Sequence, residues 1–206
     1  IFADINYDDQ TINIESIKKK ITSKTKAIIT VGVYGLSPDM DPIMEIAAQH
    51  NLVVIEDSAQ SLGSYYPDGS HIGRKGHAGS FSFSAPKIIS TGQGGAIITD
   101  DDEIASRLRR LKDFGRDGGG SDIHESIGYN FKFTELQAVI GIEQMKKLPD
   151  RVNRKKEIYL RYQEGLRGMQ DIQLFANNMQ TTAPWFYDVI VDRREDLMAH
   201  LKTKGI

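Results

Sequence analysis

Short apolar runs alternate with segments of helical periodicity along the first half of the chain. The runs that read as strands are residues 26–33, 52–55, 80–84 and 95–99. A helical pattern follows the first run, with Asp41 expected at its N-cap and Pro42 at its first helical position. Because strands that alternate with helices form mostly parallel sheets, we predict an α/β fold.

The second half of the chain is predicted to be largely helical. The expected elements are a helix over 101–114, a helix from a Thr134–Gln137 capping box to Leu148, a charged helix over 153–166, a strand over 185–191 and a helix over 195–204. Pro149 is expected to mark the end of the capping-box helix. We expect residues 1–152 to form part of a large domain. Residues 153–206 would then be a connecting helix and the start of a smaller α+β domain.

Both ends of the sequence suggest an interior part of a longer protein. Residues 1–4 (IFAD) read as a strand already in progress, and the chain has no initial Met. Gly205 follows a helical pattern, as a C-cap glycine does, so we expect a further segment after it.

Composition excludes several classes of protein. The chain has 206 residues, of which 39% are hydrophobic and 26% charged, and its formal net charge is −2. That balance argues against general affinity for nucleic acid or anionic membranes. The chain contains no cysteine, which excludes disulfides and thiolate metal sites. The absence of cysteine is also compatible with a cytoplasmic location. No apolar run is long enough to span a bilayer.

Asp57 ends a buried apolar run, and ligands bind outside the carboxyl ends of strands in open α/β sheets. A carboxylate at such a position must be hydrogen-bonded, paired or functional. A helix cap or a loop ion pair is the structural alternative.

Lys87 lies just beyond the strand expected over 80–84 and is followed by a glycine-rich turn, residues 91–95 (TGQGG). It could bind phosphate or form an imine, although the order of residues does not fit a P-loop. Most lysines are simply exposed. Pro86 favours a functional role because it stiffens the backbone directly before the amine.

The five histidines suggest no metal site. His71 and His77 could be combined with Asp68, but a polar loop explains them better. We therefore predict no metal.

Five motifs in order resemble the DegT/StrS-type nucleotide-sugar aminotransferases. They are residues 54–60 (VIEDSAQ), residues 81–87 (FSFSAPK), the glycine-rich turn 91–95, residues 128–138 (GYNFKFTELQA) and the strand that contains Trp185. Residues 86–87 and 185–187 look most like the GDP-perosamine synthase branch. The resemblance covers nearly the whole chain and implies the three-layer α-β-α large domain of fold-type I enzymes that use pyridoxal phosphate (PLP).

The resemblance also implies roles for individual residues. Asp57 would pair with the PLP pyridine nitrogen, Gln60 would bind near its phenolic oxygen, and Ser82 would bind its phosphate. Lys87 would form the Schiff base and then move the substrate proton. Asn130 would reach the phosphate of a neighbouring subunit, which implies a homodimer with shared active sites. The substrates would be a keto-sugar nucleotide and an amino acid such as glutamate, with pyridoxamine phosphate as the intermediate form of the cofactor.

The sequence departs from the family pattern at Gln93, where the family usually has Glu before the paired glycines. The family's glycine-threonine phosphate-binding segment and its ring-stacking aromatic residue would lie upstream of Ile1. We therefore expect residues 1–206 alone to hold PLP poorly.

Three other readings remain. A sugar dehydratase of the same family would use the same cofactor, but that branch has histidine in place of Lys87. A non-catalytic regulatory relative would not be expected to retain Asp57, Gln60 and Lys87 together. A plain α/β binding domain would leave the combination of Asp57 and Lys87 unexplained.

Overall fold

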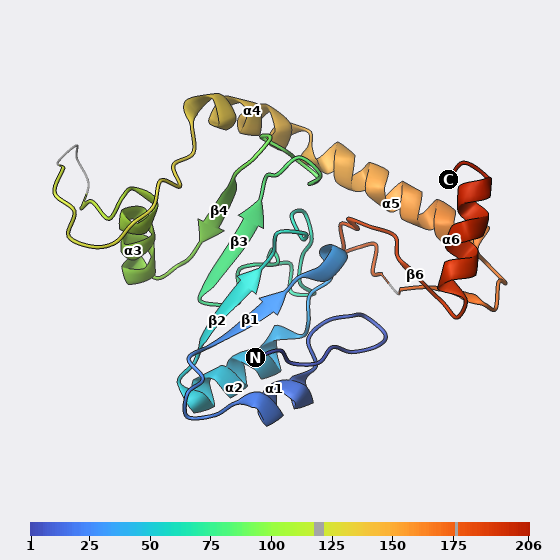
Figure 1. Cartoon of the computed structure of the whole chain (residues 1–206), viewed down its shortest axis with the longest axis horizontal. Helices are drawn as coiled ribbons and strands as arrows, with labels where there is room; N and C mark the ends of the chain where they lie inside the picture. Colours follow the sequence, from blue (N-terminus) through green and yellow to red (C-terminus); the bar gives the residue numbers. More distant parts are fainter. Residues whose placement is uncertain (118–121, 176) are drawn as a thin grey trace.

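A four-stranded mixed sheet organises the first half of the chain (Figure 1). The computed structural model describes residues 1–117, 122–175 and 177–206. The sheet order is β1 (Ala27–Val31), β2 (Val53–Asp57), β3 (Ala78–Ser82) and β4 (Gly95–Ile98). β2 pairs in parallel with β1 and β3, and β4 is antiparallel to β3. The predicted α/β class with a largely parallel sheet is confirmed.

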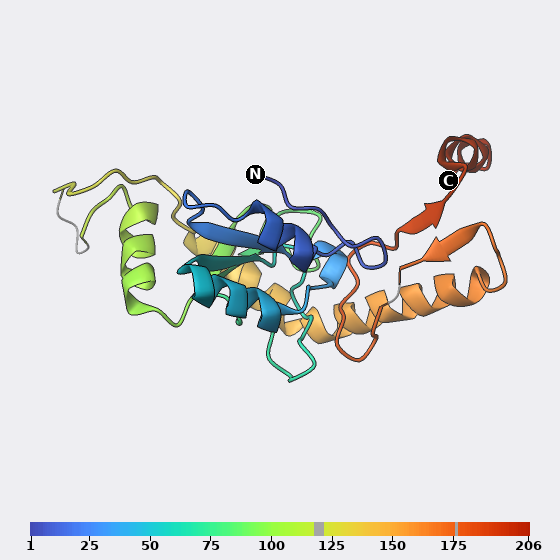
Figure 2. The ribbon, with the colours of Figure 1, turned by 90° about the horizontal axis from the view of Figure 1, so that it is seen from below.

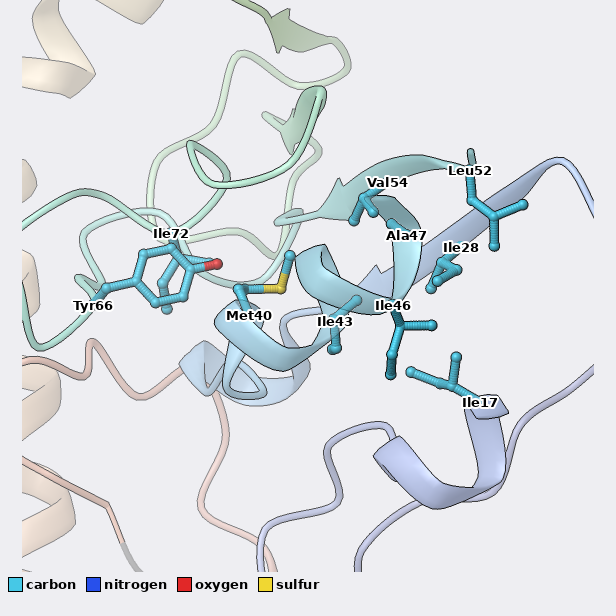
Figure 3. Close-up of a cluster of buried hydrophobic side chains, with 10 residues drawn as sticks. All are labelled: Ile17, Ile28, Met40, Ile43, Ile46, Ala47, Leu52, Val54, Tyr66 and Ile72. Carbon is cyan, nitrogen blue, oxygen red and sulfur yellow. The ribbon is translucent and has the colours of Figure 1, made fainter. Parts of the chain in front are cut away.

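Two helices cover one face of β1 and β2. They are α1 (Ile14–Lys20) and α2 (Met40–His50). Alternate strand residues point at them, and Figure 3 shows Ile28 and Val54 packed with the apolar side chains of both helices. On the opposite face Ile29 and Val53 are 60% and 40% exposed. The sheet therefore has a covered face and an open face along β1 and β2.

The start of α2 differs from the sequence expectation. Its N-cap is Asp39, whose Oδ1 accepts the Asp41 N–H at 3.2 Å. Pro42 consequently lies in the first helical turn, where its missing N–H leaves no bond unmade. The prediction placed the cap two residues too late because both aspartates are good caps and the sequence does not choose between them.

The later helices are α3 (Asp102–Lys112), α4 (Glu135–Lys146), α5 (Leu148–Gly165) and α6 (Arg194–Thr203). The Thr134–Gln137 capping box is confirmed at the start of α4. The start expected at residue 153 is wrong, because α5 begins at Leu148 with Pro149 in its first turn. Pro149 thus opens a helix as well as following one. α5 runs without a break past residue 152, the limit we had placed on the large domain.

A separate two-stranded sheet pairs β5 (Ile172–Leu174) with β6 (Val189–Val191) in antiparallel fashion. Figure 2 shows these strands and α6 beyond the four-stranded sheet, at the far end of α5. The strand expected over 185–191 is shorter than predicted, and β5 was not predicted.

The predictions for the two ends had different outcomes. Residues 1–4 form no strand, although Ile5 bridges Ile12, and α1 was not predicted. Gly205 follows α6 with φ +76°, as expected of a C-cap glycine. No helix in residues 1–117, 122–175 and 177–206 has the length and apolar character needed to cross a membrane.

Ile43→Ala tests the core between α2 and the sheet. Ile43 is fully buried, so truncation should lower the free energy of unfolding by about 2–5 kcal/mol, measured by urea denaturation. Leu160→Ala is the matched control, since Leu160 is 48% exposed on α5 and should cost much less. Equal losses from the two variants would contradict the assigned core.

Candidate active site

Side chains from three distant parts of the sequence meet at one small cavity. It is lined by Ala59, Gln60, Leu62, Ser82, Lys87, Ile88, Ala183 and Trp185. Its volume is about 10 Å³, room for roughly one water molecule. Gln60, Ser82 and Lys87, three of the residues selected from sequence, therefore share one site.

Asp57 ends β2 on the open face of the sheet, in register with Ser80 of β3. Its Oδ1 accepts the Ala59 N–H at 3.1 Å and lies 3.5 Å from the Ser80 hydroxyl. Among the described residues no Lys, Arg or His forms an ion pair with it within 4.0 Å. The carboxylate is thus held in place by neutral donors and has capacity left for a cation.

The neighbouring carboxylate of Glu56 points to the covered face and is 2% exposed. It accepts hydrogen bonds from the Tyr66 hydroxyl and from the amides of Gly73 and Gly76. Burial and the bond to Glu56 raise the pKa of Tyr66 above its ordinary value, so Tyr66 remains a donor. Glu56 therefore anchors the 66–76 loop. Because side chains alternate along a strand, the Glu56 carboxylate is structural on the covered face, while the Asp57 carboxylate remains available on the open face.

Lys87 is half-buried rather than fully exposed. Its backbone N–H donates to Ser84 O at 3.1 Å, which closes a turn just beyond β3. Its Nζ lies 3.8 Å from the ring centroid of Trp185. Burial lowers the pKa of Lys87, and the negative charge of Asp57 acts in the opposite direction. A half-buried amine with a lowered pKa can accept a proton or attack a carbonyl more readily than a surface lysine.

Gln60 is held by the short segment that follows β1. Its Oε1 accepts the Tyr34 N–H at 2.9 Å. Tyr34 adopts φ +53° and ψ +23°, a left-handed conformation that is uncommon for a tyrosine. Sequence reasoning missed Tyr34, although a tyrosine just beyond a buried strand could have been flagged. Such a conformation is often retained where a site requires it.

Ser82 ends β3 and lies on the same face as Ser80, two residues earlier. Its hydroxyl oxygen is 3.1 Å from the Ser84 hydroxyl oxygen and 3.3 Å from the Ser84 amide nitrogen. The Ser84 N–H donates to the Ser82 hydroxyl oxygen, and the two hydroxyls lie close to each other near Lys87, where hydroxyls are suitable donors to an anionic group.

The glycine-rich turn approaches protein rather than an open ligand space. A Cβ on Gly94 would lie 2.4 Å from the Phe133 ring. The Gln93 carbonyl accepts bonds from the Thr91 hydroxyl at 2.7 Å and from Gln137 Nε2 at 2.8 Å. Gly94 thus provides close packing, and the turn connects the site to α4.

Asn130 lies outside the cavity of this chain. It is exposed and forms an isolated antiparallel β-bridge with Asp113, the residue that directly follows α3. The structure therefore does not bring it together with Lys87, Gln60 and Ser82.

Two histidines considered for a metal site accept backbone hydrogen bonds. His71 Nε2 accepts the Gly63 N–H at 2.9 Å, and His77 Nδ1 accepts the Val54 N–H at 3.0 Å. In the described residues no cluster of three or more His, Asp or Glu side chains could hold a metal ion.

The whole chain, residues 1–206, matches the DegT/DnrJ/EryC1/StrS aminotransferase family. The chain belongs to this family. It is 34% identical over its full length to GDP-perosamine synthase from Escherichia coli and spans 57% of that protein.

Solved structures of the family share the fold. DesV of S. venezuelae superposes with a TM-score of 0.91 at 33% identity, over 100% of this chain and 55% of that one. A mutant GDP-4-keto-6-deoxymannose-3-dehydratase with bound GDP-perosamine superposes at 0.85 with 28% identity, over 100% of this chain and 58% of that one. Aminotransferase and dehydratase relatives are therefore both similar in fold.

Asp57→Asn tests the electrostatic link between the two site residues. Removing the negative charge removes the influence that raises the pKa of Lys87, so this pKa should fall further below 10.5. Acetylation of Lys87 across a pH series, read by mass spectrometry in cofactor-free protein, measures the shift. Asp8→Asn, at an exposed position, is the control. An unchanged or raised Lys87 pKa would contradict the geometry.

Proposed function

We propose that this chain carries the catalytic lysine of a PLP-dependent nucleotide-sugar aminotransferase, and that Lys87 is that residue. One observation carries the proposal: a half-buried lysine of lowered pKa shares a site with Gln60 and Ser82 and feels the charge of an unpaired carboxylate, Asp57. Family membership agrees with that chemistry.

The residues present fit PLP as a ligand. The spare capacity of the Asp57 carboxylate suits a protonated pyridine nitrogen. The Ser82 and Ser84 hydroxyls suit a phosphate, and Gln60 supplies an amide held by Tyr34. When bound, PLP acts as an electron sink that stabilises negative charge on the substrate carbon. The protein's part would be to hold the pyridine nitrogen in its protonated form, and Asp57 is the residue that would pair with it.

Lys87 supplies the amine that would bind the cofactor and then handle the proton. Its lowered pKa increases the fraction of neutral amine, the form that attacks a carbonyl or takes a proton from carbon. The ring of Trp185 lies against the amine on one side. The lowered pKa makes Nζ better suited to proton transfer than the amine of a surface lysine.

A keto-sugar nucleotide is the proposed amino acceptor, and glutamate or a similar amino acid the donor. The names of relatives that act on GDP-linked sugars support the acceptor class. Amino sugars made in this way would serve cell-surface polysaccharide or related biosynthesis, and we place the reaction in the cytoplasm.

Lys87 itself argues against the two rival functions. A dehydratase of this family would have histidine at this position. A regulatory relative would have no need of an amine with a perturbed pKa beside an unpaired carboxylate. Amino transfer is therefore the favoured reaction.

A homodimer is the proposed assembly. Large apolar side chains are exposed around α4: Ile127, Phe131, Leu136, Val139 and Ile142. Exposed apolar side chains gathered along one stretch of the chain favour association. Asn130 lies within the same part of the chain, which agrees with its proposed contact with a neighbouring active site.

Lys87→Arg tests the proposed reaction. Arginine keeps the positive charge but cannot lose its proton, so release of 2-oxoglutarate from glutamate and a panel of 3- and 4-keto sugar nucleotides should fall about 100-fold or more. Lys24→Arg, at an exposed position, is the control. The assay uses the full-length protein. Wild-type turnover by the Lys87 variant, or no amino transfer by the wild type with any acceptor, would overturn the proposal.

Leu136→Glu combined with Val139→Glu tests the assembly. Both side chains are exposed on α4, 80% and 61%, so charges there should convert dimer to monomer in sedimentation-velocity experiments. Met198→Glu, at an exposed position on α6, should leave the mass unchanged. A double variant that remains dimeric would place the interface elsewhere.

A further inference from the structure

Trp185 lies next to Lys87 although 98 positions separate the two residues in the sequence. We propose that Trp185 is a positioning residue, whose ring face holds the free Lys87 amine inside the site and whose indole N–H fixes the backbone directly before it. The inference deepens the proposed function and rests on it.

Two contacts join the indole to the same dipeptide. Lys87 Nζ lies 3.8 Å from the ring centroid, well within the range of a cation–π interaction, and tryptophan is the strongest partner for one. Trp185 Nε1 donates to the Pro86 carbonyl at 3.0 Å. The ring thus holds the end of the lysine side chain while its N–H holds the start of the residue's backbone.

The backbone that carries the indole is anchored independently of Lys87. The Trp185 backbone N–H donates to Tyr34 O at 3.1 Å, and its carbonyl accepts Lys155 Nζ at 2.8 Å. The next residue, Phe186, makes an edge-to-face contact with Tyr34 at 5.8 Å. Tyr34, in the segment that follows β1, and Lys155 of helix α5 therefore fix the backbone of Trp185 in place.

The same tyrosine serves both sides of the site. Tyr34 donates its N–H to Gln60 and accepts the Trp185 N–H at its carbonyl. In its left-handed conformation, the Tyr34 N–H reaches Gln60 and the Tyr34 carbonyl reaches Trp185. Both partners line the cavity. Tyr34 thereby fixes the positions of Gln60 and Trp185 relative to each other. Through Trp185 it also positions the amine of Lys87.

An amino-transfer reaction needs such a holder. The Lys87 amine must be free whenever the substrate occupies the cofactor, and must then stay close enough to take and return a proton. A lysine carries its strongly hydrated amine on a flexible four-carbon chain, so a free amine tends to move out of the site into solvent. The indole face offers it a defined resting position within the site.

Matched variants separate the ring face from simple bulk. Trp185→Phe keeps an aromatic face and loses the N–H, whereas Trp185→Leu keeps apolar bulk and loses the face. Because only the aromatic ring stabilises the ammonium, the Lys87 pKa in cofactor-free protein should be lower in the Leu variant by roughly half a unit or more. Acetylation of Lys87 across a pH series, read by mass spectrometry, gives both values. Asp57 and Lys155 remain unchanged in both variants.

Identical Lys87 pKa values in the two variants would overturn the proposal, since a purely structural tryptophan predicts no difference between them. Trp185→Met replaces the Leu variant should that protein not fold. The measurement uses no cofactor or substrate, so it stands apart from the test of amino transfer. A lack of turnover by the wild type would remove the proposed function, while the order of the pKa values would still decide whether Trp185 holds the amine.

Discussion

The pairing of β2 with β1 on one side and β3 on the other sets the geometry of the site. Parallel register places Val31 beside Asp57 and Asp57 beside Ser80, so the segments that leave β1, β2 and β3 begin at one edge of the sheet. Gln60, Tyr34, Ser82 and Lys87 all lie on those segments. A one-residue slip of β2 would exchange Glu56 and Asp57 between the covered and the open face, burying the carboxylate the site needs.

Much of this arrangement could be predicted from the sequence. The alternation of strands and helices indicates the fold class. Parallel strands place their carboxyl ends at one edge of the sheet, which is why Asp57 and Lys87 were selected as candidates. The capping box at Thr134 was equally readable because its pattern is local. The errors at Asp39 and Leu148 concern element boundaries, where neighbouring residues offer equivalent caps and tertiary packing decides. The strand expected over residues 1–4 does not form.

Other features could not be read from local patterns. The contact of Trp185 with Lys87 depends on how α5 and the following strand return to the sheet, and no spacing in the sequence encodes that path. The left-handed conformation of Tyr34 likewise goes with hydrogen bonds to Gln60 and Trp185, which lie far from it in the sequence. The role of Glu56 as a buried anchor depends on the 66–76 loop that folds over it. The sequence places Glu56 next to Asp57 and does not show which of the two carboxylates is buried.

The central claim is that Lys87 is the amine to which the cofactor is attached. Borohydride reduction of the full-length protein incubated with PLP, followed by peptide mapping, tests it most directly because reduction makes the attachment permanent. The account predicts a PLP-modified peptide that contains Lys87, and its absence in Lys87→Arg. Modification of a different lysine, or an unchanged yield in Lys87→Arg, would contradict the claim.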